Sequence, residues 1–303
     1  MANRRQHNIP QFYLRQFLSP GWVYRRGADA PRFVKSPAGV AMQKDYYGRN
    51  KAAREPLDDL NSYVEDKGAP SFMNLIRSPK TITQYDWLVL SYLFANLFVR
   101  NPAVIEEWRA AALKATARVN AVAEKMTDRL IAASLAGSDL SEFQSEPEDE
   151  SATMTLDQFN KHAAKLRAEG GHRIAASDMF VAFPDIAECI QQMSFIVWEA
   201  PHNFSFLTSD RSLVLQSRAT GSRAHVGWKN PDALGSIALC PNHFLTMFYY
   251  EPSGIYLAKA TPEQVAGLNL ETIKFAEQEI YSPFKYPEAN DWMNAVGRWH
   301  PKE

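Results

Sequence analysis

The residues best suited to chemistry lie almost at the start of the chain, in the sequence HNIPQFYLRQF at residues 7–17. An N-terminal segment is normally frayed and polar. Here aromatic residues, a leucine and a proline of fixed φ follow one another so closely that we expect the segment to pack against the body of the protein. Packing would bring His7 and Arg15 with it. Histidine can act as a general base or metal ligand, and arginine can bind an anion, so this segment is the first candidate for a site.

Other ionisable residues also occur in apolar contexts. Burial of such a group costs several kcal/mol unless the group is paired. One interpretation is structural: an internal ion-pair network fastens the N-terminal segment to a helical core, with one of two arginines bound to Glu65 or Asp210. The residues concerned are His7, Arg15, Asp45, Glu65, Arg100 and Asp210.

The alternative interpretation of these residues is a reactive pocket. A histidine would act as general base or metal ligand, two carboxylates would assist it, and arginines would bind an anion such as phosphate. One histidine with carboxylates could hold at most a hard cation, Mg²⁺ or Mn²⁺. The candidate catalytic residues are His7, Glu65 and Asp210, and the candidate substrate-binding residues are Arg15, Arg100, Tyr13 and Ser209.

No diagnostic catalytic motif accompanies these candidates. Ser209 lacks a Gly-x-Ser-x-Gly elbow, and Ser-Asp at a strand end is commonly a turn whose side chains bind backbone amides. Gly170-Gly171 lacks the Lys-Ser/Thr of a phosphate-binding loop. Other histidines are expected in solvated or loop positions rather than as ligands: His162, His172, His202, His225 and His243.

Composition and charge limit the class of protein. The 303 residues are 46% hydrophobic and 22% charged, and we expect one globular domain over 1–303. The net charge of −1 provides no global attraction to nucleic acid or membranes. Residues 1–55, however, carry eleven Lys/Arg against three Asp/Glu, which predicts either a solvated basic rim or a local patch that holds a polyanion.

Cysteine usage and hydropathy favour a cytoplasmic protein with no membrane partner. The N-terminal sequence lacks the apolar run of a signal peptide, and the apolar run over residues 87–99 is too short to span a bilayer. Cys189 and Cys240 lie far apart in apolar surroundings, where we expect reduced core residues.

The N-terminal and helical parts must position the candidate residues. Within 1–55, residues 21–26 and 32–36 predict a hairpin, on which aromatic side chains either pack inward or form a platform. Residues 56–193 have the pattern of a helical bundle, in which Thr83 before Asp86 is a typical N-cap for an apolar helix ending at Arg100. The elements expected are helices from about Pro56, over 84–100, 104–135, 156–169 and 174–193 (with a kink near Pro184), and an exposed acidic loop over 137–151.

Residues 194–283 change to β-branched and aromatic runs separated by Pro, Gly, Asn and Asp, which predicts an antiparallel sheet. Thr261-Pro262 then opens a closing helix whose apolar positions continue to Ile280, before a tail over 284–303. The expected class is α+β: a docked N-terminal segment and small hairpin, a central helical bundle, and a C-terminal antiparallel sheet with a closing helix. The strands are expected over residues 195–200, 204–208, 212–216, 236–239 and 244–250.

The order of several short motifs resembles a bacterial family. These motifs are HxxPxxYLRxF at 7–17, WVY at 22–24, DYY at 45–47, Glu65 before Gly68-Ala69, RNP at 100–102, FLTSD at 206–210, and Asn269 to Ala276 with YSP at 281–283. Together they resemble the family catalogued as domain of unknown function 4238 (DUF4238), and the chain departs from that pattern at Ser212, where the family has proline. The resemblance implies little about activity.

Two classes of function fit these features. The first is a hydrolase acting on a phosphate-bearing substrate such as nucleic acid, a metal-assisted phosphodiesterase or nuclease whose basic hairpin holds the backbone. The second is a non-catalytic recognition module that binds an anionic ligand or a protein partner, in a bacterial defence or stress system. A histidine beside arginines in a docked segment favours the hydrolase slightly, because it is an unusual choice for stability alone.

Overall fold

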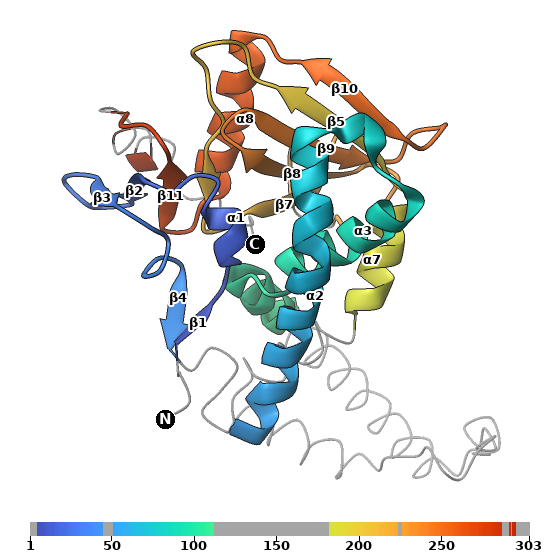
Figure 1. Cartoon of the computed structure of the whole chain (residues 1–303), viewed down its shortest axis with the longest axis horizontal. Helices are drawn as coiled ribbons and strands as arrows, with labels where there is room; N and C mark the ends of the chain where they lie inside the picture. The colour runs from blue at the N-terminus through green and yellow to red at the C-terminus, as the bar shows by residue number, and fades with distance from the viewer. Residues whose placement is uncertain are drawn as a thin grey trace, which may run out of the picture. The chain divides into compact units, whose positions relative to one another are not determined.

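The computed structural model describes residues 5–44, 51–111, 182–223, 226–286, 291 and 293–294 (Figure 1). The chain divides into two compact units, Met1–Val104 with Met179–Glu303, and Ile105–Asp178. The site lies in the first unit. The long helix expected over 104–135 is described only as far as the helix Pro102–Ala111. The acidic loop, the helix over 156–169 and the first residues of the helix over 174–193 lie outside the described residues.

The N-terminal segment packs against the core, as its composition predicts. Strand β1 (Arg5–His7) pairs with β4 (Met42–Lys44), and helix α1 (Gln11–Leu14) follows Pro10. The next turn buries Phe17 completely. The rings of Phe12 and Tyr13 lie edge-on to Phe72, at 5.6 and 5.9 Å between centroids. Aromatic contacts therefore hold the segment on helix α2 (Lys51–Arg77).

The predicted hairpin is confirmed, and two later strands extend it into a sheet. Strands β2 (Gly21–Arg25) and β3 (Arg32–Val34) pair with β11 (Glu279–Ser282) and β6 (Thr208–Ser209) in the antiparallel order β3-β2-β11-β6. Tyr24 is buried, whereas the Trp22 and Phe33 rings contact each other at 5.2 Å on a more exposed surface. Gly21 is required here, because a Cβ atom would lie 2.2 Å from the carbonyl oxygen of Phe17.

The helical bundle consists of α2, α3 (Gln84–Val99) and α7 (Phe183–Gln191) among the described residues. A capping box between Thr83 and Asp86 begins α3, as predicted, and the helix ends before Asn101-Pro102. Helix α2 begins at Lys51, earlier than the predicted start near Pro56. Pro184 occupies the first turn of α7, where its missing N–H removes no helical hydrogen bond. The residues immediately before 182 lie outside the described part of the chain, so the predicted kink stays a prediction.

The large sheet has the strand order β10-β5-β9-β8-β7. Its strands are β5 (Ser194–Glu199), β7 (Leu213–Ser217), β8 (Ala233–Cys240), β9 (His243–Phe248) and β10 (Ile255–Lys259). The central pairings are antiparallel, as expected, and β10 adds an unpredicted parallel edge beside β5. The fold is thus α+β. Cys189 and Cys240 are buried free thiols, as predicted.

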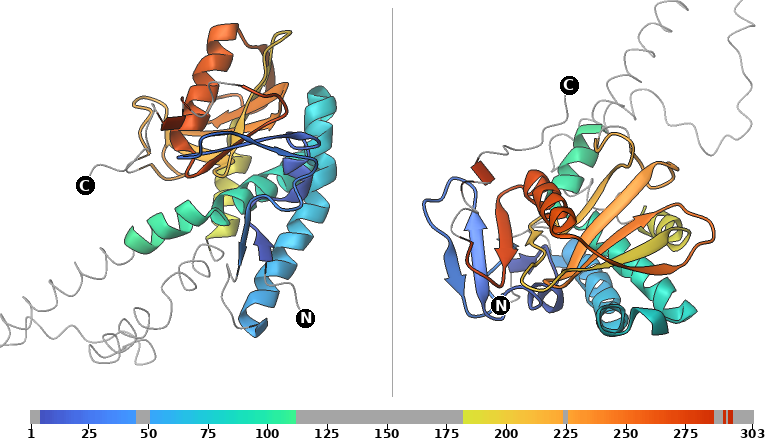
Figure 2. Two further views of the ribbon diagram at one scale, coloured as in Figure 1. Left: turned by 90° about the vertical axis from the view of Figure 1, so that its left-hand side faces the viewer. Right: turned by 90° about the horizontal axis from the view of Figure 1, so that it is seen from above.

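Helices cover the large sheet from opposite sides. The Trp87 ring of α3 stacks on Phe195 of β5, with 4.9 Å between centroids. Helix α8 (Pro262–Phe275) lies on the other side of the sheet from α2 and α3 (Figure 2). The helix predicted to continue to Ile280 ends at Phe275, because Ala276 is extended and residues 277–279 donate their amides to Asp210.

No single helix among the described residues is long and apolar enough to cross a membrane. Helix α3 and the helix Pro102–Ala111 reach the necessary length and composition only as a bent pair. The C-terminal half of α3 is buried in the protein core.

Candidate functional site

Three of the predicted site residues meet at the end of α3. Arg100 is only 4% exposed. Its guanidinium donates to the Glu65 carboxylate of α2, to the backbone carbonyl of His7 and, at 3.4 Å, to Oδ1 of Asn96. The structural interpretation predicts this type of ion pair. We call Arg100, Glu65 and His7 the N-terminal clamp, because they join the first strand to both long helices.

The His7 ring is half-buried and both of its nitrogens have partners. Nδ1 lies 3.2 Å from the carbonyl oxygen of Val40, and Nε2 lies 2.7 Å from Nε2 of Gln11. A carbonyl only accepts, so Nδ1 carries the proton and Nε2 accepts from the Gln11 amide. Burial lowers the pKa of His7, as does the nearby Arg100, against the opposing effects of Val40 and Glu65. The ring is therefore neutral near pH 7.

Arg15 and Tyr13 lie in different environments. The Arg15 side chain is exposed and donates to Oε1 of Gln11 at 3.5 Å, so Gln11 lies between it and His7. The Tyr13 hydroxyl is buried 2.6 Å from Oγ1 of Thr208 and donates to the carbonyl of Ala238 at 2.7 Å. Burial raises the pKa of Tyr13 far above the physiological range. Tyr13 is thus a neutral core group, whereas Arg15 is open to solvent.

Ser209 and Asp210 shape the turn after β6. The buried Ser209 hydroxyl donates to the carbonyl of Arg211 and accepts from its amide, which matches the turn expected for a Ser-Asp pair. The Asp210 carboxylate accepts the backbone amides of Glu277, Gln278 and Glu279 at 2.8, 2.7 and 3.1 Å. Burial raises the pKa of Asp210 to about 6, against these three donors, which lower it. Asp210 thus fixes the start of β11 and forms no part of the N-terminal clamp.

A cavity of about 470 Å³ is lined by Asp210 and by Asn8 and Asn101, which are the sequence neighbours of His7 and Arg100 in the N-terminal clamp. Asn101 connects the two regions, because it follows Arg100 and donates from Nδ2 to the Asp210 carbonyl at 3.2 Å. We call this space the polar cavity. It is lined by Asn8, Arg25, Gly39, Ala41, Met42, Asn101, Pro102, Ala103, Asp210, Glu277, Gln278, Glu279 and Tyr281.

Two opposite charges face the polar cavity from adjacent strands. Arg25 of β2 and Glu279 of β11 are cross-strand partners, so their side chains extend from the same face. Among the described residues, no ion pair within 4.0 Å joins them, and the Glu279 carboxylate accepts from the Tyr281 hydroxyl at 3.0 Å. Asn8 adds a buried amide oxygen, Oδ1, with no hydrogen-bond partner. A cationic donor and a carboxylate acceptor therefore both line the cavity and are available to a ligand.

The predicted metal site and the predicted basic hairpin surface do not come together with the N-terminal clamp. Within the described part of the chain, no group of three or more His, Cys, Asp or Glu could hold a metal ion, so the residues give no cage for Mg²⁺ or Mn²⁺. Arg26, one of the basic residues of the hairpin, donates to the carbonyls of Ile273 and Ala276 at the end of α8. Asp45 and His225 lie outside the described residues.

Sequence reasoning missed the residues that give the polar cavity its chemistry. Arg25 was part of a general basic excess, whereas Glu279 and Asn8 carried no signal. Their proximity depends on the pairing of β2 with β11, across more than 250 residues of chain. A prediction of strand β11 from its sequence EIYS would have been the only available signal.

The chain belongs to the family DUF4238, described as a protein of unknown function, whose model matches residues 5–285. No curated protein and no solved structure matches the chain. Family membership therefore assigns no reaction, and the chemistry of the site must be inferred from the chain's own residues.

Proposed function

We propose that this protein is a non-catalytic recognition module that binds a small zwitterionic molecule, of the α-amino acid class, in the polar cavity. The observation that carries the proposal is the pair Arg25 and Glu279, which face one cavity from adjacent strands without pairing with each other. Arginine is the preferred partner of a carboxylate, and carboxylate and amide oxygens bind an ammonium group.

The ligand chemistry follows from the groups on the cavity wall. A ligand carboxylate would bind Arg25, which retains the anion recognition expected from the sequence. A ligand ammonium would donate to the Glu279 carboxylate, and Asn8 lines the same cavity. The cavity volume of about 470 Å³ lies within the range for small-molecule sites.

The surrounding structure supports a preformed site. Asp210 fixes the backbone of residues 277–279, and the N-terminal clamp fixes the segment that carries Asn8. These two lining segments are thus held by charge-assisted hydrogen bonds, which limits the ordering that binding requires of them.

The hydrolase acting on a phosphate-bearing substrate is the second candidate, and His7 is the observation that favours it. Its Nε2 is the basic nitrogen of a neutral ring, as a general base requires. The substrate would have to displace the Gln11 amide from Nε2 of His7. Mg²⁺ or Mn²⁺ would need ligands from the substrate in addition to those from the protein. Cleavage of a nucleic acid that His7→Ala abolishes and His7→Gln does not restore would support this candidate.

The experiment for the proposed function is a thermal-shift screen of the full chain against the twenty common L-α-amino acids at millimolar concentration. We expect a small subset to raise the melting temperature. Arg25→Gln and Glu279→Gln should each weaken binding of a hit at least about tenfold, the value of one charge-assisted hydrogen bond. Lys35→Gln removes an exposed charge outside the cavity and is the matched control. No shift with any amino acid, or equal loss in the control, would contradict the proposal.

A further inference from the structure

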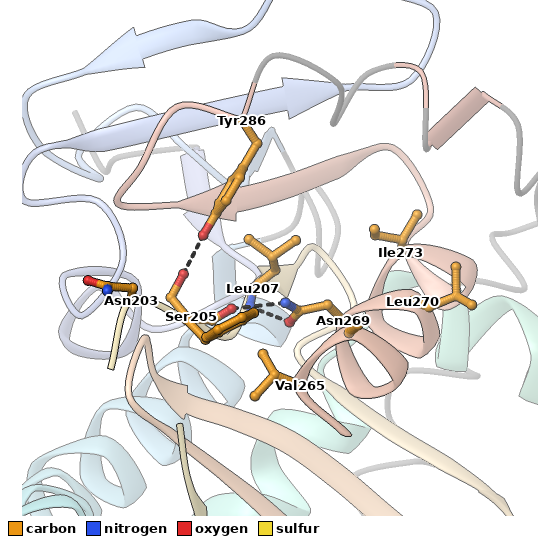
Figure 3. Close-up of a pocket in the computed structure, with 10 residues that line it drawn as sticks. Asn203, Ser205, Leu207, Val265, Asn269, Leu270, Ile273 and Tyr286 are labelled. Carbon is orange, nitrogen blue, oxygen red and sulfur yellow. Dashed lines mark hydrogen bonds between the residues drawn. The ribbon is translucent and has the colours of Figure 1, made fainter. Parts of the chain in front are cut away.

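A second cavity lies between α8 and the loop that precedes β6 (Figure 3). Its volume is about 550 Å³ and every lining residue is uncharged. We call it the apolar pocket. The residues that line it are Asn203, Phe204, Ser205, Leu207, Val265, Ala266, Asn269, Leu270, Ile273 and Tyr286.

The floor of the apolar pocket is part of the protein core. Leu207, Val265 and Ile273 are 1, 2 and 3% exposed. Leu207 and Ile273 also belong to the hydrophobic cluster that includes Ile280 of β11. A ligand that enters the pocket would therefore contact buried apolar side chains that are already held in place.

The wall formed by the loop is fixed to α8 by one side chain. Asn269 accepts the Leu207 amide at Oδ1, at 2.8 Å, and donates from Nδ2 to the Ser205 carbonyl at 2.9 Å. Figure 3 shows this amide reaching from α8 to the loop backbone. Because both of these loop groups are satisfied, the loop presents side chains rather than open backbone to the pocket. The pocket is thus preformed and does not depend on a ligand for its shape.

Among the polar groups that line the apolar pocket are two hydroxyls that bond to each other. The hydroxyls of Ser205 and Tyr286 point toward one another at 2.5 Å (Figure 3). A serine hydroxyl has one proton and two lone pairs, so the Ser205 oxygen retains capacity for a second hydrogen bond beside Tyr286. At the mouth, Phe204 and Leu270 are 43 and 49% exposed, so two large apolar side chains on facing elements remain accessible to a ligand.

We propose that the apolar pocket binds an uncharged small molecule with a compact aromatic or aliphatic body and one hydroxyl or carbonyl group. The apolar walls exclude a charged ligand, since none of the lining groups could pair with its charge. The ligand oxygen would bond at the Ser205 hydroxyl, and the apolar body would cover Leu207, Val265 and Ile273. This site is separate from the polar cavity, so its ligand is a second effector and does not depend on the function proposed above.

The test uses N-phenyl-1-naphthylamine, a neutral dye whose fluorescence rises in apolar surroundings, with the full chain. We expect saturable binding. Ala266→Phe should fill the pocket from an exposed helical position and weaken dye binding at least about tenfold. Gly267→Phe is the matched control, because it places the same ring on the next residue, where a Cβ atom meets nothing within 4 Å. Leu270→Arg, which places a charge at the mouth, is a second blocking variant.

Competition with the dye tests the polar end of the pocket. 1-Naphthol should displace the dye at a lower concentration than naphthalene does, and Ser205→Ala should remove this difference. Equal dye binding by wild type, Ala266→Phe and Leu270→Arg would overturn the proposal, as would no binding at all. If Ala266→Phe instead converts a dimer into a monomer and leaves dye binding unchanged, this face is an interface between copies and the ligand proposal fails.

Discussion

Replacing Arg100 by methionine should lower the free energy of unfolding by about 3 kcal/mol, the low end of the range for a buried ion pair that loses one partner. The low end applies because the Glu65 side chain is 25% exposed, so water can solvate part of the freed carboxylate. The His7 carbonyl also loses a donor. The N-terminal segment should therefore lose protection from hydrogen exchange before the whole protein unfolds.

The reciprocal change, Glu65→Met, should cost more. It leaves a guanidinium whose side chain is only 5% exposed without its carboxylate. The double variant Arg100→Met/Glu65→Met removes both charges. Its free energy of unfolding should fall by at least about 1 kcal/mol less than the sum of the decreases in the two single variants. This coupling energy would measure the interaction between Arg100 and Glu65 directly.

The assay is urea unfolding at pH 7.5, followed by tryptophan fluorescence, with hydrogen exchange of residues 5–17 as a local readout. Arg15→Met is the control, because its exposed guanidinium makes one long contact of 3.5 Å to Gln11. The control should change stability by less than about 0.5 kcal/mol. An Arg100→Met loss as small as that of Arg15→Met, or strict additivity of the Arg100 and Glu65 substitutions, would show that this ion pair does not stabilise the protein.

Three further predictions concern the core and the turn after β6. Burial raises the pKa of Asp210 from its usual value of 3.8 to about 6 in the fold, so its favourable contribution to stability should be present below pH 3.8 and lost as the pH rises through 6. Urea titrations from pH 4 to 7 should show a relative loss of about 2 kcal/mol in wild type against Asp210→Asn, and parallel curves would refute this. Tyr13→Phe should cost about 1 to 3 kcal/mol, because the Ala238 carbonyl loses its donor, and an unchanged urea midpoint would count against it. Deletion of residues 1–18 removes the fully buried Phe17 with its neighbours and should cost at least about 3 kcal/mol, so a truncated chain that keeps the wild-type melting temperature would show that the segment is dispensable.

Local signals predicted the parts of the fold that depend on neighbouring residues. The Thr83–Asp86 capping box needs only four residues, and the β2–β3 hairpin needs only a turn between two alternating runs. The N-terminal segment revealed its packing through the density of its apolar residues. The Arg100–Glu65 pair was predictable as one of several options, because a buried arginine must find a carboxylate.

Long-range pairing explains what the sequence could not predict. Strand β11 has four residues and exists because β2 pairs along one side of it and β6 along the other. Asp210 binds backbone amides, which have no residue-type signature, so its partners could not be read from the chain. The polar cavity depends on the pairing of β2 with β11 and on the hydrogen bonds between Asp210 and residues 277–279. For this reason Arg25 and Glu279 emerged only from the structure.

The most direct test of the central claim is a calorimetric titration of the full chain with the amino acid that gives the largest thermal shift, its N-acetyl derivative and its methyl ester. Each derivative removes one charge from the ligand and leaves the rest nearly unchanged. The account predicts that each modification raises Kd at least about tenfold, because the carboxylate and the ammonium bind different groups of the polar cavity. Equal Kd values for the three compounds, or no measurable heat with any of them, would contradict it.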